Sequence, residues 1–152
     1  MLFRSTGSGE GVKRYGWSAS QYIQAIIEHL FGIDYDALHG YVRIFPHIPK
    51  KLTGQEISIR ELILPTAAGT RLGVSVKQSV DLHSMEVAIT ISGKRPELKL
   101  QVLCGNAGNK RYEIRNQKGR ILPALEKFSG VSGAVGAELK LAEAERITFR
   151  VK

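Results

Sequence analysis

Apolar and polar residues follow two different periods along this chain, and the period changes near residue 40. Before that point, apolar side chains recur every three or four positions, at Tyr22, Ile23, Ile26, Ile27, Leu30 and Phe31. This spacing places them on one face of a helix. Ser18 suits the N-cap and Gln21 completes a possible capping box, while Gly32 follows where a glycine commonly ends a helix. The sequence therefore predicts one amphipathic helix between Ser18 and Gly32.

From residue 41 onward, apolar residues alternate with polar ones, which is the period of a half-buried strand. Eight or nine short segments show it, at residues 41–45, 55–64, 72–76, 85–91, 98–102, 110–115, 121–125, 139–141 and 147–151. Glu61 breaks the alternation of the second segment, so we expect a bulge there. No helical pattern separates the segments, which argues against a parallel α/β sheet. The expected fold is mainly β, a jelly-roll-like antiparallel β-sandwich with one N-terminal amphipathic helix.

Two units are expected along the chain. Residues 1–38 form a glycine-rich loop and the helix, and residues 39–152 form the β-sandwich domain. The glycine-rich stretch at residues 7–11 lacks the Gly-Lys-Ser/Thr ending of a phosphate-binding loop, and no strand precedes it, so a flexible loop is the expected structure. A helix of about four turns is marginal alone. Its apolar face must therefore pack either on the sheets of this chain or on helices outside it.

Composition fits a globular protein. The chain has 152 residues, of which 43% are hydrophobic and 24% charged, and this balance excludes general disorder. No apolar stretch is long enough to span a membrane, and the N-terminus lacks the apolar region of a signal peptide. Cys104 is the only cysteine, so it forms no internal disulfide and leaves the compartment undecided. It ends an apolar run, and we expect it to be buried.

The net charge of +8 invites a polyanion-binding hypothesis. The densest basic stretch holds Lys110, Arg111, Arg115, Lys118 and Arg120. Tyr112 and Ile114 alternate with these charges, so a strand with a solvated polar face explains the spacing. A nucleic-acid surface would use the same residue types, but no recognition-helix, zinc-finger or RNP pattern is present. Nucleic acid is therefore not the favoured partner.

Four short stretches carry a resemblance beyond their periodicity: residues 15–23 (YGWSASQYI), 28–33 (EHLFGI), 38–40 (LHG) and 44–49 (IFPHIP). They resemble the end of glycoside hydrolases built on an (α/α)6 barrel, α-L-rhamnosidase-like and related families. In those families, a Gly-Trp-Ser/Thr-Ala opening starts the last barrel helix. A proline-containing segment then leads into a C-terminal β-sandwich. The match covers about residues 15–49, and the rest agrees in strand pattern only.

The resemblance implies a function for this chain within a larger enzyme. It would be a non-catalytic C-terminal accessory domain that packs on and stabilises a helical catalytic barrel. The catalytic carboxylates of such enzymes lie on barrel loops that this sequence lacks, so no catalytic residue is carried over. The implied partner is that barrel, or a second copy of the chain bound through the helix. No cofactor is expected.

Three residues are candidates for contacting sugar. Glu10 lies before the helix, on the side that faces the active-site mouth in such barrels, although a solvated loop carboxylate is the ordinary interpretation. Trp17 starts the helix and can stack on a sugar ring with Tyr15 beside it. Equally, Trp17 precedes Ser18 and can form a hydrophobic staple with Tyr22. Both interpretations of Trp17 stay open.

Other chemistry has little support in the sequence. The four histidines, His29, His39, His47 and His83, lack metal-ligand spacing, so no metal site is expected. No nucleophile elbow supports a Ser-His-Asp triad. The alternatives to an accessory domain are a free-standing carbohydrate-binding module, which the single tryptophan disfavours, and a basic polyanion or nucleic-acid binding protein.

Overall fold

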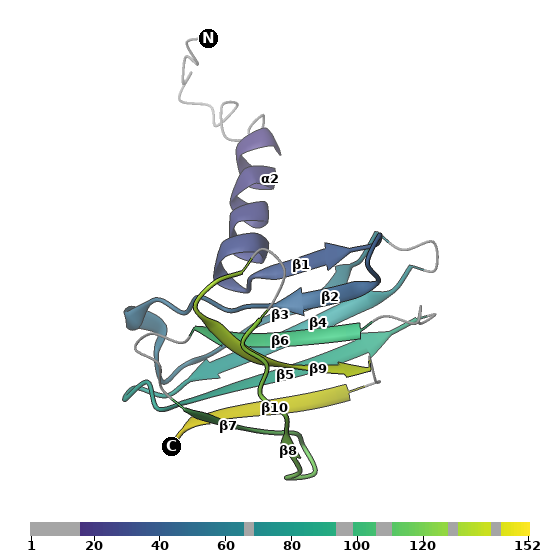
Figure 1. Ribbon diagram of the computed structural model, residues 1–152. Helices are drawn as coiled ribbons and strands as arrows, with labels where there is room; N and C mark the ends of the chain where they lie inside the picture. Colours follow the sequence, from purple (N-terminus) through teal and green to yellow (C-terminus); the bar gives the residue numbers. More distant parts are fainter. Residues whose placement is uncertain (1–15, 66–68, 94–98, 106–110, 128–130, 141–143) are drawn as a thin grey trace.

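The described residues form ten strands in two sheets, and helix α2 projects from this body (Figure 1). The computed structural model describes residues 16–65, 69–93, 99–105, 111–127, 131–140 and 144–152. A four-stranded sheet has the order β1-β2-β6-β9, and a six-stranded sheet has the order β3-β4-β5-β10-β7-β8. One hydrophobic core contains residues of both sheets. The expectation of a mainly β sandwich with one N-terminal helix is confirmed.

The strands of the smaller sheet are β1 (Ile33–Asp36), β2 (Tyr41–Ile44), β6 (Lys99–Gly105) and β9 (Ala134–Lys140). Those of the larger sheet are β3 (Glu56–Ile63), β4 (Arg71–Gln78), β5 (Ser84–Ser92), β7 (Tyr112–Arg115), β8 (Ile121–Leu122) and β10 (Ala144–Val151). All paired strands are antiparallel except β2 and β6. That parallel pair forms because β3, β4 and β5, which separate the two strands in sequence, belong to the other sheet.

The alternating segments of the sequence correspond to β2 through β10. The bulge expected at Glu61 is confirmed: the pairing of β3 with β4 shifts between Ile59 and Leu62, and Glu61 has a φ of 56°. Strand β1 was not predicted, because it is short and directly follows the helix. It pairs with β2, so the hydrogen bonds of this strand pair connect residues on both sides of the expected boundary between residues 38 and 39. The division itself stays a prediction.

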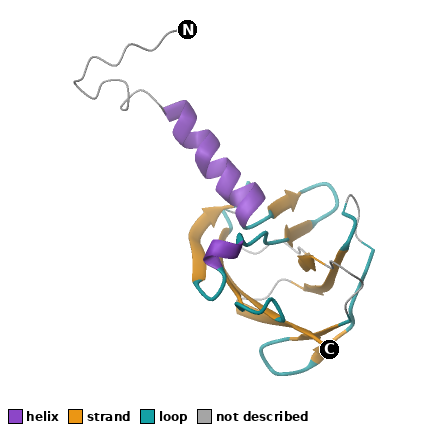
Figure 2. Cartoon of the chain, turned by 90° about the vertical axis from the view of Figure 1, so that its left-hand side faces the viewer, coloured by secondary structure: helices purple, strands orange, loops and turns teal. Residues whose placement is uncertain are grey.

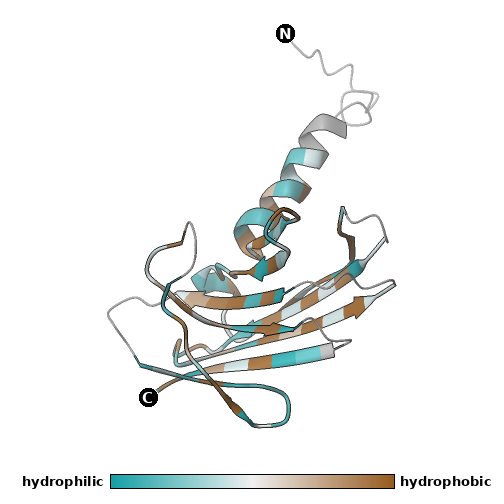
Figure 3. Cartoon of the chain, turned by 45° about the vertical axis from the view of Figure 1, so that its right-hand side comes forward, coloured by the Kyte–Doolittle hydropathy of each residue, from teal (hydrophilic) through white to brown (hydrophobic). Residues whose placement is uncertain are grey.

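Hydrophobic and hydrophilic residues alternate along the strands (Figure 3), and the buried apolar side chains of both sheets form one core. The largest fully buried side chain is Phe149 of β10, and Ile147 of the same strand is also fully buried. Each such side chain stabilises the fold by about 1.5–3 kcal/mol relative to an exposed one. Cys104, the second-last residue of β6, belongs to this core, as expected. Burial raises the pKa of its thiol to about 11. A neutral, buried thiol is a poor nucleophile at physiological pH.

Helix α2 (Gly16–Ala25) continues into a π-helical turn, Ile26–Leu30. It begins before Ser18, so Ser18 lies in its first turn and the predicted N-cap position is wrong. Figures 1 and 2 show the helix projecting away from the sandwich, with only its C-terminal end at the sheets. No helix in the described ranges has the length and hydropathy needed to cross a bilayer.

The joint between helix and sandwich is a pair of backbone hydrogen bonds. The Phe45 N–H donates to the Gly32 carbonyl, and the His47 N–H donates to the Leu30 carbonyl, both at 3.0 Å. Gly32 has a φ of 60°, which places it in the left-handed region as a helix-ending glycine. A Cβ atom there would lie 1.9 Å from the Phe45 carbonyl oxygen. The close approach that holds the helix on the sandwich therefore requires glycine.

We expect Gly32→Ala to destabilise the protein far more than Gly40→Ala. Both glycines have positive φ, but nothing lies within 4 Å of a Cβ at Gly40, so that variant pays only the left-handed strain of about 1–2 kcal/mol. Gly32→Ala must also push Phe45 away, which should cost on the order of 2 kcal/mol more. Urea denaturation followed by circular dichroism measures the difference. Equal losses in the two variants would contradict this account of the joint.

Candidate functional site

The three residues predicted to contact sugar are not brought together by the described part of the structure. Glu10 and Tyr15 lie outside the described residues. Trp17 belongs to α2 by its backbone, but its side chain also lies outside what is described. Sugar stacking and the hydrophobic staple therefore both stay predictions.

Two of the histidines are held by nearby carboxylates in surface turns. The backbone N–H and imidazole of His39 both bind Asp36, and these hydrogen bonds lower the pKa of the Asp36 carboxyl. The Ser79 hydroxyl, followed by the His83 backbone, lowers the pKa of Asp81. Within the described ranges, no group of three or more His, Cys, Asp or Glu side chains is arranged to hold a metal ion. These histidines stabilise turns.

The outer face of the four-stranded sheet carries a polar row that crosses all four strands. The strand register places Asp34, Arg43, Gln101 and Glu138 side by side, in that order. The Arg43 Nε donates to Gln101 Oε1 at 3.2 Å, and Gln101 Nε2 donates to Glu138 Oε2 at 3.0 Å. The bond from Gln101 holds the pKa of Glu138 below its ordinary value, although partial burial opposes it. One glutamine thus links an arginine and a glutamate across three strands.

Arg43 is unusual in this row because it is only 7% exposed. Its guanidinium carbon lies 4.8 Å from the centroid of the Tyr41 ring, which is a favourable cation–π geometry. Its Nη1 is 3.9 Å from Asp34 Oδ2, and its Nη2 is buried without a hydrogen-bond partner. Burying a charge is costly unless its polar atoms are satisfied. Gln101 is therefore the principal hydrogen-bond partner that makes the burial of Arg43 tolerable.

We expect Gln101→Ala to destabilise the protein by about 1–3 kcal/mol, because it leaves a second nitrogen of the buried Arg43 without a partner. Asp34→Asn should cost less than about 1 kcal/mol, since Asp34 is exposed and its ion pair is long. Denaturation midpoints in guanidinium chloride distinguish the two variants. A larger loss for Asp34→Asn would mean that the ion pair, and not Gln101, holds Arg43.

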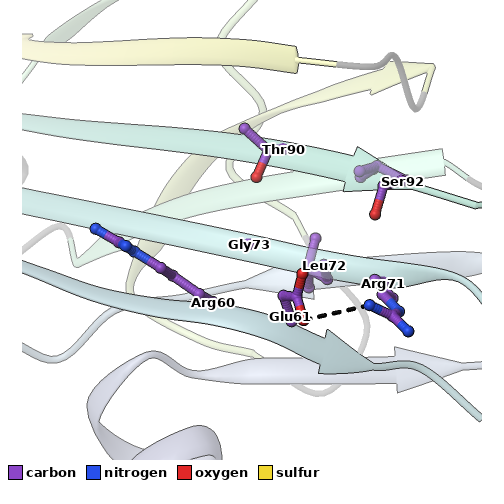
Figure 4. Close-up of a pocket in the computed structure, with 8 residues that line it drawn as sticks. Arg60, Glu61, Arg71, Leu72, Gly73, Thr90 and Ser92 are labelled. Atoms are coloured by element: carbon purple, nitrogen blue, oxygen red, sulfur yellow. Dashed lines mark hydrogen bonds and ion pairs between the residues drawn. The ribbon is translucent and has the colours of Figure 1, made fainter.

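A groove runs over the outer face of the six-stranded sheet (Figure 4). It consists of two overlapping hollows, of about 260 and 220 Å³, which share Arg60, Gly73 and Thr90. Arg71, Glu61 and Ser92 line one end, and Ser58, Ser75 and Ala88 line the other. We call this surface the sheet groove. Its floor is made of the small side chains of β4 and β5, and its arginines come from β3 and β4.

The sheet groove exists because of two local features. Gly73 lies opposite Thr90 in the register, and a Cβ at Gly73 would lie within 2.4 Å of Thr90 Oγ1, so the missing side chain leaves room for the threonine. The bulge at Glu61 turns this carboxylate toward Arg71, and the two form a 3.2 Å ion pair, drawn in Figure 4. Arg60 forms no ion pair with another described residue.

Beside the sheet groove, a separate hollow of about 370 Å³ lies on the same face at β7 and β10. Three arginines surround it: Arg115, Arg146 and Arg150. Arg115 is paired with Glu113, and this contact, with a smaller contribution from Lys152, lowers the pKa of the glutamate. Arg146 pairs with Glu86 of β5, whereas Arg150 forms no ion pair with a described residue. We call this surface the arginine hollow.

Strand β7 contains part of the basic stretch noticed in the sequence. Ile114 is buried while Glu113 and Arg115 line the arginine hollow, so the expected alternation is confirmed. The sequence did not reveal the sheet groove. Its small outward residues are visible in the alternation, but nothing in the sequence shows that β3, β4 and β5 lie side by side.

Neither a family model nor a curated protein matches this sequence. The functional inference therefore depends on three features of the molecule. They are the projecting helix, the polar row around the buried Arg43 on one face, and the sheet groove with the arginine hollow on the other.

Proposed function

We propose that this chain is a non-catalytic accessory domain of a carbohydrate-active enzyme, and that helix α2 packs it onto a helical catalytic domain. The observation that carries the proposal is the exposure of two large side chains on the projecting helix. Tyr22 is 70% exposed and Ile23 is 56% exposed. In contrast, Ile26, Ile27 and Leu30 at the other end of the same stripe pack partly on the core. The first two residues of the apolar stripe thus have no cover from the described residues.

A helix in this position is expected to have a partner. Most helical stability in proteins comes from the packing of an apolar face, and short isolated helices are marginal in water. The backbone bonds at Gly32 and Leu30 fix the base of the helix, so Tyr22 and Ile23 are held at a defined place outside the sandwich. A rigidly presented apolar surface is suited to docking.

The occupant we favour is the helical barrel of a glycoside hydrolase. Residues 15–49 resemble the passage from the last barrel helix into the C-terminal sandwich of such enzymes. The joint at Gly32 and Phe45 lies inside this stretch and determines how the helix leaves the sandwich. A barrel helix beside Tyr22 and Ile23 would complete the burial of the stripe.

The carboxylates of the described residues support a non-catalytic role. A glycosidase needs a carboxylic acid with a raised pKa close to a second carboxylate. The carboxyl groups with shifted pKa values are Asp36, Asp81, Glu113 and Glu138, and all four shift downward through hydrogen bonds and ion pairs. Groups held ionised in this way are poor general acids.

We expect the purified chain to release no nitrophenol from a panel of aryl-glycosides above the rate in buffer, because no described carboxyl group has the raised pKa of a general acid. A characterised glycosidase at the same concentration serves as the positive control. Turnover by the wild-type chain that disappears in Glu10→Gln would contradict the proposal, since it would place catalysis in this chain.

We expect the double variant Tyr22→Glu, Ile23→Glu to lose a partner that the wild type captures from an extract of the source organism. The matched control is Gln21→Glu, Gln24→Glu, which adds the same charge at exposed polar positions of the same helix. All three proteins should unfold within about 0.5 kcal/mol of one another, because the changed side chains are exposed.

Mass spectrometry identifies the captured protein. The supporting result is a helical-barrel glycoside hydrolase that binds the wild type and the control but not the double variant. Capture of nothing, capture of a protein of another class, or equal capture by the double variant would each contradict docking through α2.

A further inference from the structure

We propose that the sheet groove binds an acidic oligosaccharide, meaning a sugar chain that carries carboxylate or sulfate groups at intervals. The assignment of a carbohydrate rests on the proposed function. The anionic character and the location of the site follow from the residues of the groove and do not depend on the helix.

The shape of the groove suits an extended ligand. Gly73, Ser75, Ala88 and Thr90 leave a low floor across β4 and β5. Arg60 on β3 borders this floor on one side, and Arg146 on β10 follows Ala88 in the register on the other. Since neighbouring strands are about 4.8 Å apart, β3 and β10 are separated by roughly 14 Å. A single extended chain fits between Arg60 and Arg146.

The chemistry of the groove matches a ligand with hydroxyl groups and occasional anions. Arg60 has no ion pair with a described residue, and Arg71 is bound only to the exposed Glu61, so both can offer N–H groups to a carboxylate or sulfate. Hydroxyl groups also line the groove, at Ser58, Thr90 and Ser92 and at Ser75, whose hydroxyl already donates to Glu56. These can both donate to and accept from sugar hydroxyls.

Two competing ligands fit less well. A nucleic acid carries a phosphate at every residue, and Glu56, Glu61 and Glu86 on the same face would repel such a dense row of charge. Sugar hydroxyls, in contrast, can donate to these carboxylates. Single-stranded nucleic acids and neutral sugars are commonly held by stacking on aromatic rings. Among the described residues, no aromatic side chain lines the sheet groove or the arginine hollow.

The arginine hollow extends the same surface. Arg146 faces Ala88 of the groove floor in the register, and Arg150 lies further along the same strand. Arg150 has no ion pair with a described residue, and Thr148, which also lines the hollow, lies between the two arginines along the strand. A longer acidic chain can therefore continue from the sheet groove into the arginine hollow.

Isothermal titration calorimetry on the whole chain tests the proposal with four ligands. They are a hyaluronan hexasaccharide, which carries a carboxylate on every second sugar, a sparsely sulfated oligosaccharide of similar length, maltohexaose and a short oligo-dT. We expect one or both acidic sugars to bind and maltohexaose not to bind. The two acidic arms show whether carboxylate or sulfate is preferred.

Two variants place the binding in the groove. Arg60→Gln with Arg71→Gln removes its charge, and Ala88→Leu fills its floor without changing charge. Each should weaken binding of the acidic sugar about tenfold or more, the loss of about 1.4 kcal/mol expected for one charged hydrogen bond. Lys50→Gln with Lys51→Gln removes the same charge from an exposed turn outside the groove and should change affinity less than twofold. Circular dichroism shows whether each variant is folded. If a variant does not fold, NMR amide shifts of the wild-type protein on addition of the acidic sugar locate the binding site instead.

The proposal is overturned if the acidic sugars bind no tighter than maltohexaose, or if the Lys50 and Lys51 variant loses as much affinity as the groove variants. Tighter binding of oligo-dT than of either acidic sugar would instead assign a nucleic-acid surface. None of these outcomes affects capture through Tyr22 and Ile23 or the aryl-glycoside result, so failure here is distinguishable from failure of the proposed function.

Discussion

Phe149 and Ile147 of β10 lie fully buried in the core between the two sheets, and the fold depends on the packing of these two side chains against that core. Strand β10 is internal in the six-stranded sheet, where it pairs with both β5 and β7. The sheet is therefore complete only when the C-terminal segment is in place. Because the inward positions of every long strand supply the core, the outward positions are free to carry polar side chains, and both candidate surfaces are built on them.

The two outer faces use this freedom in opposite ways. On the four-stranded sheet, long polar side chains bind one another across the strands, and Arg43 is buried among them. On the six-stranded sheet, small side chains at the centre leave a groove, with arginines at its sides. The first face has most of its polar groups engaged and stabilises the domain. The second face has arginines without partners among the described residues, which makes it the better binding surface.

The helix adds a separate surface at one end of the sandwich. Its base is locked by the close approach of Gly32 to Phe45, and Tyr22 and Ile23 are exposed further along it, where we propose that a partner packs. Docking through the helix and binding through the sheet groove involve different elements. Under our proposal, the domain would attach to a catalytic domain through the helix while its broad sheet face stays open to a carbohydrate.

Alternation within the sequence predicted the strands from β2 to β10, the bulge of β3 at Glu61 and the burial of Cys104, because these features depend on neighbouring residues alone. Strand pairing depends on contacts between distant segments, so only the tertiary structure decided that β2 and β6 are parallel, that β1 joins them, and that Gly73 faces Thr90. The groove and the Arg43 row follow from that register. The sequence likewise showed that the helix has an apolar face, but the structure decided that the sandwich covers only its last turn, since the joint at Gly32 directs the rest of the helix away from the sheets.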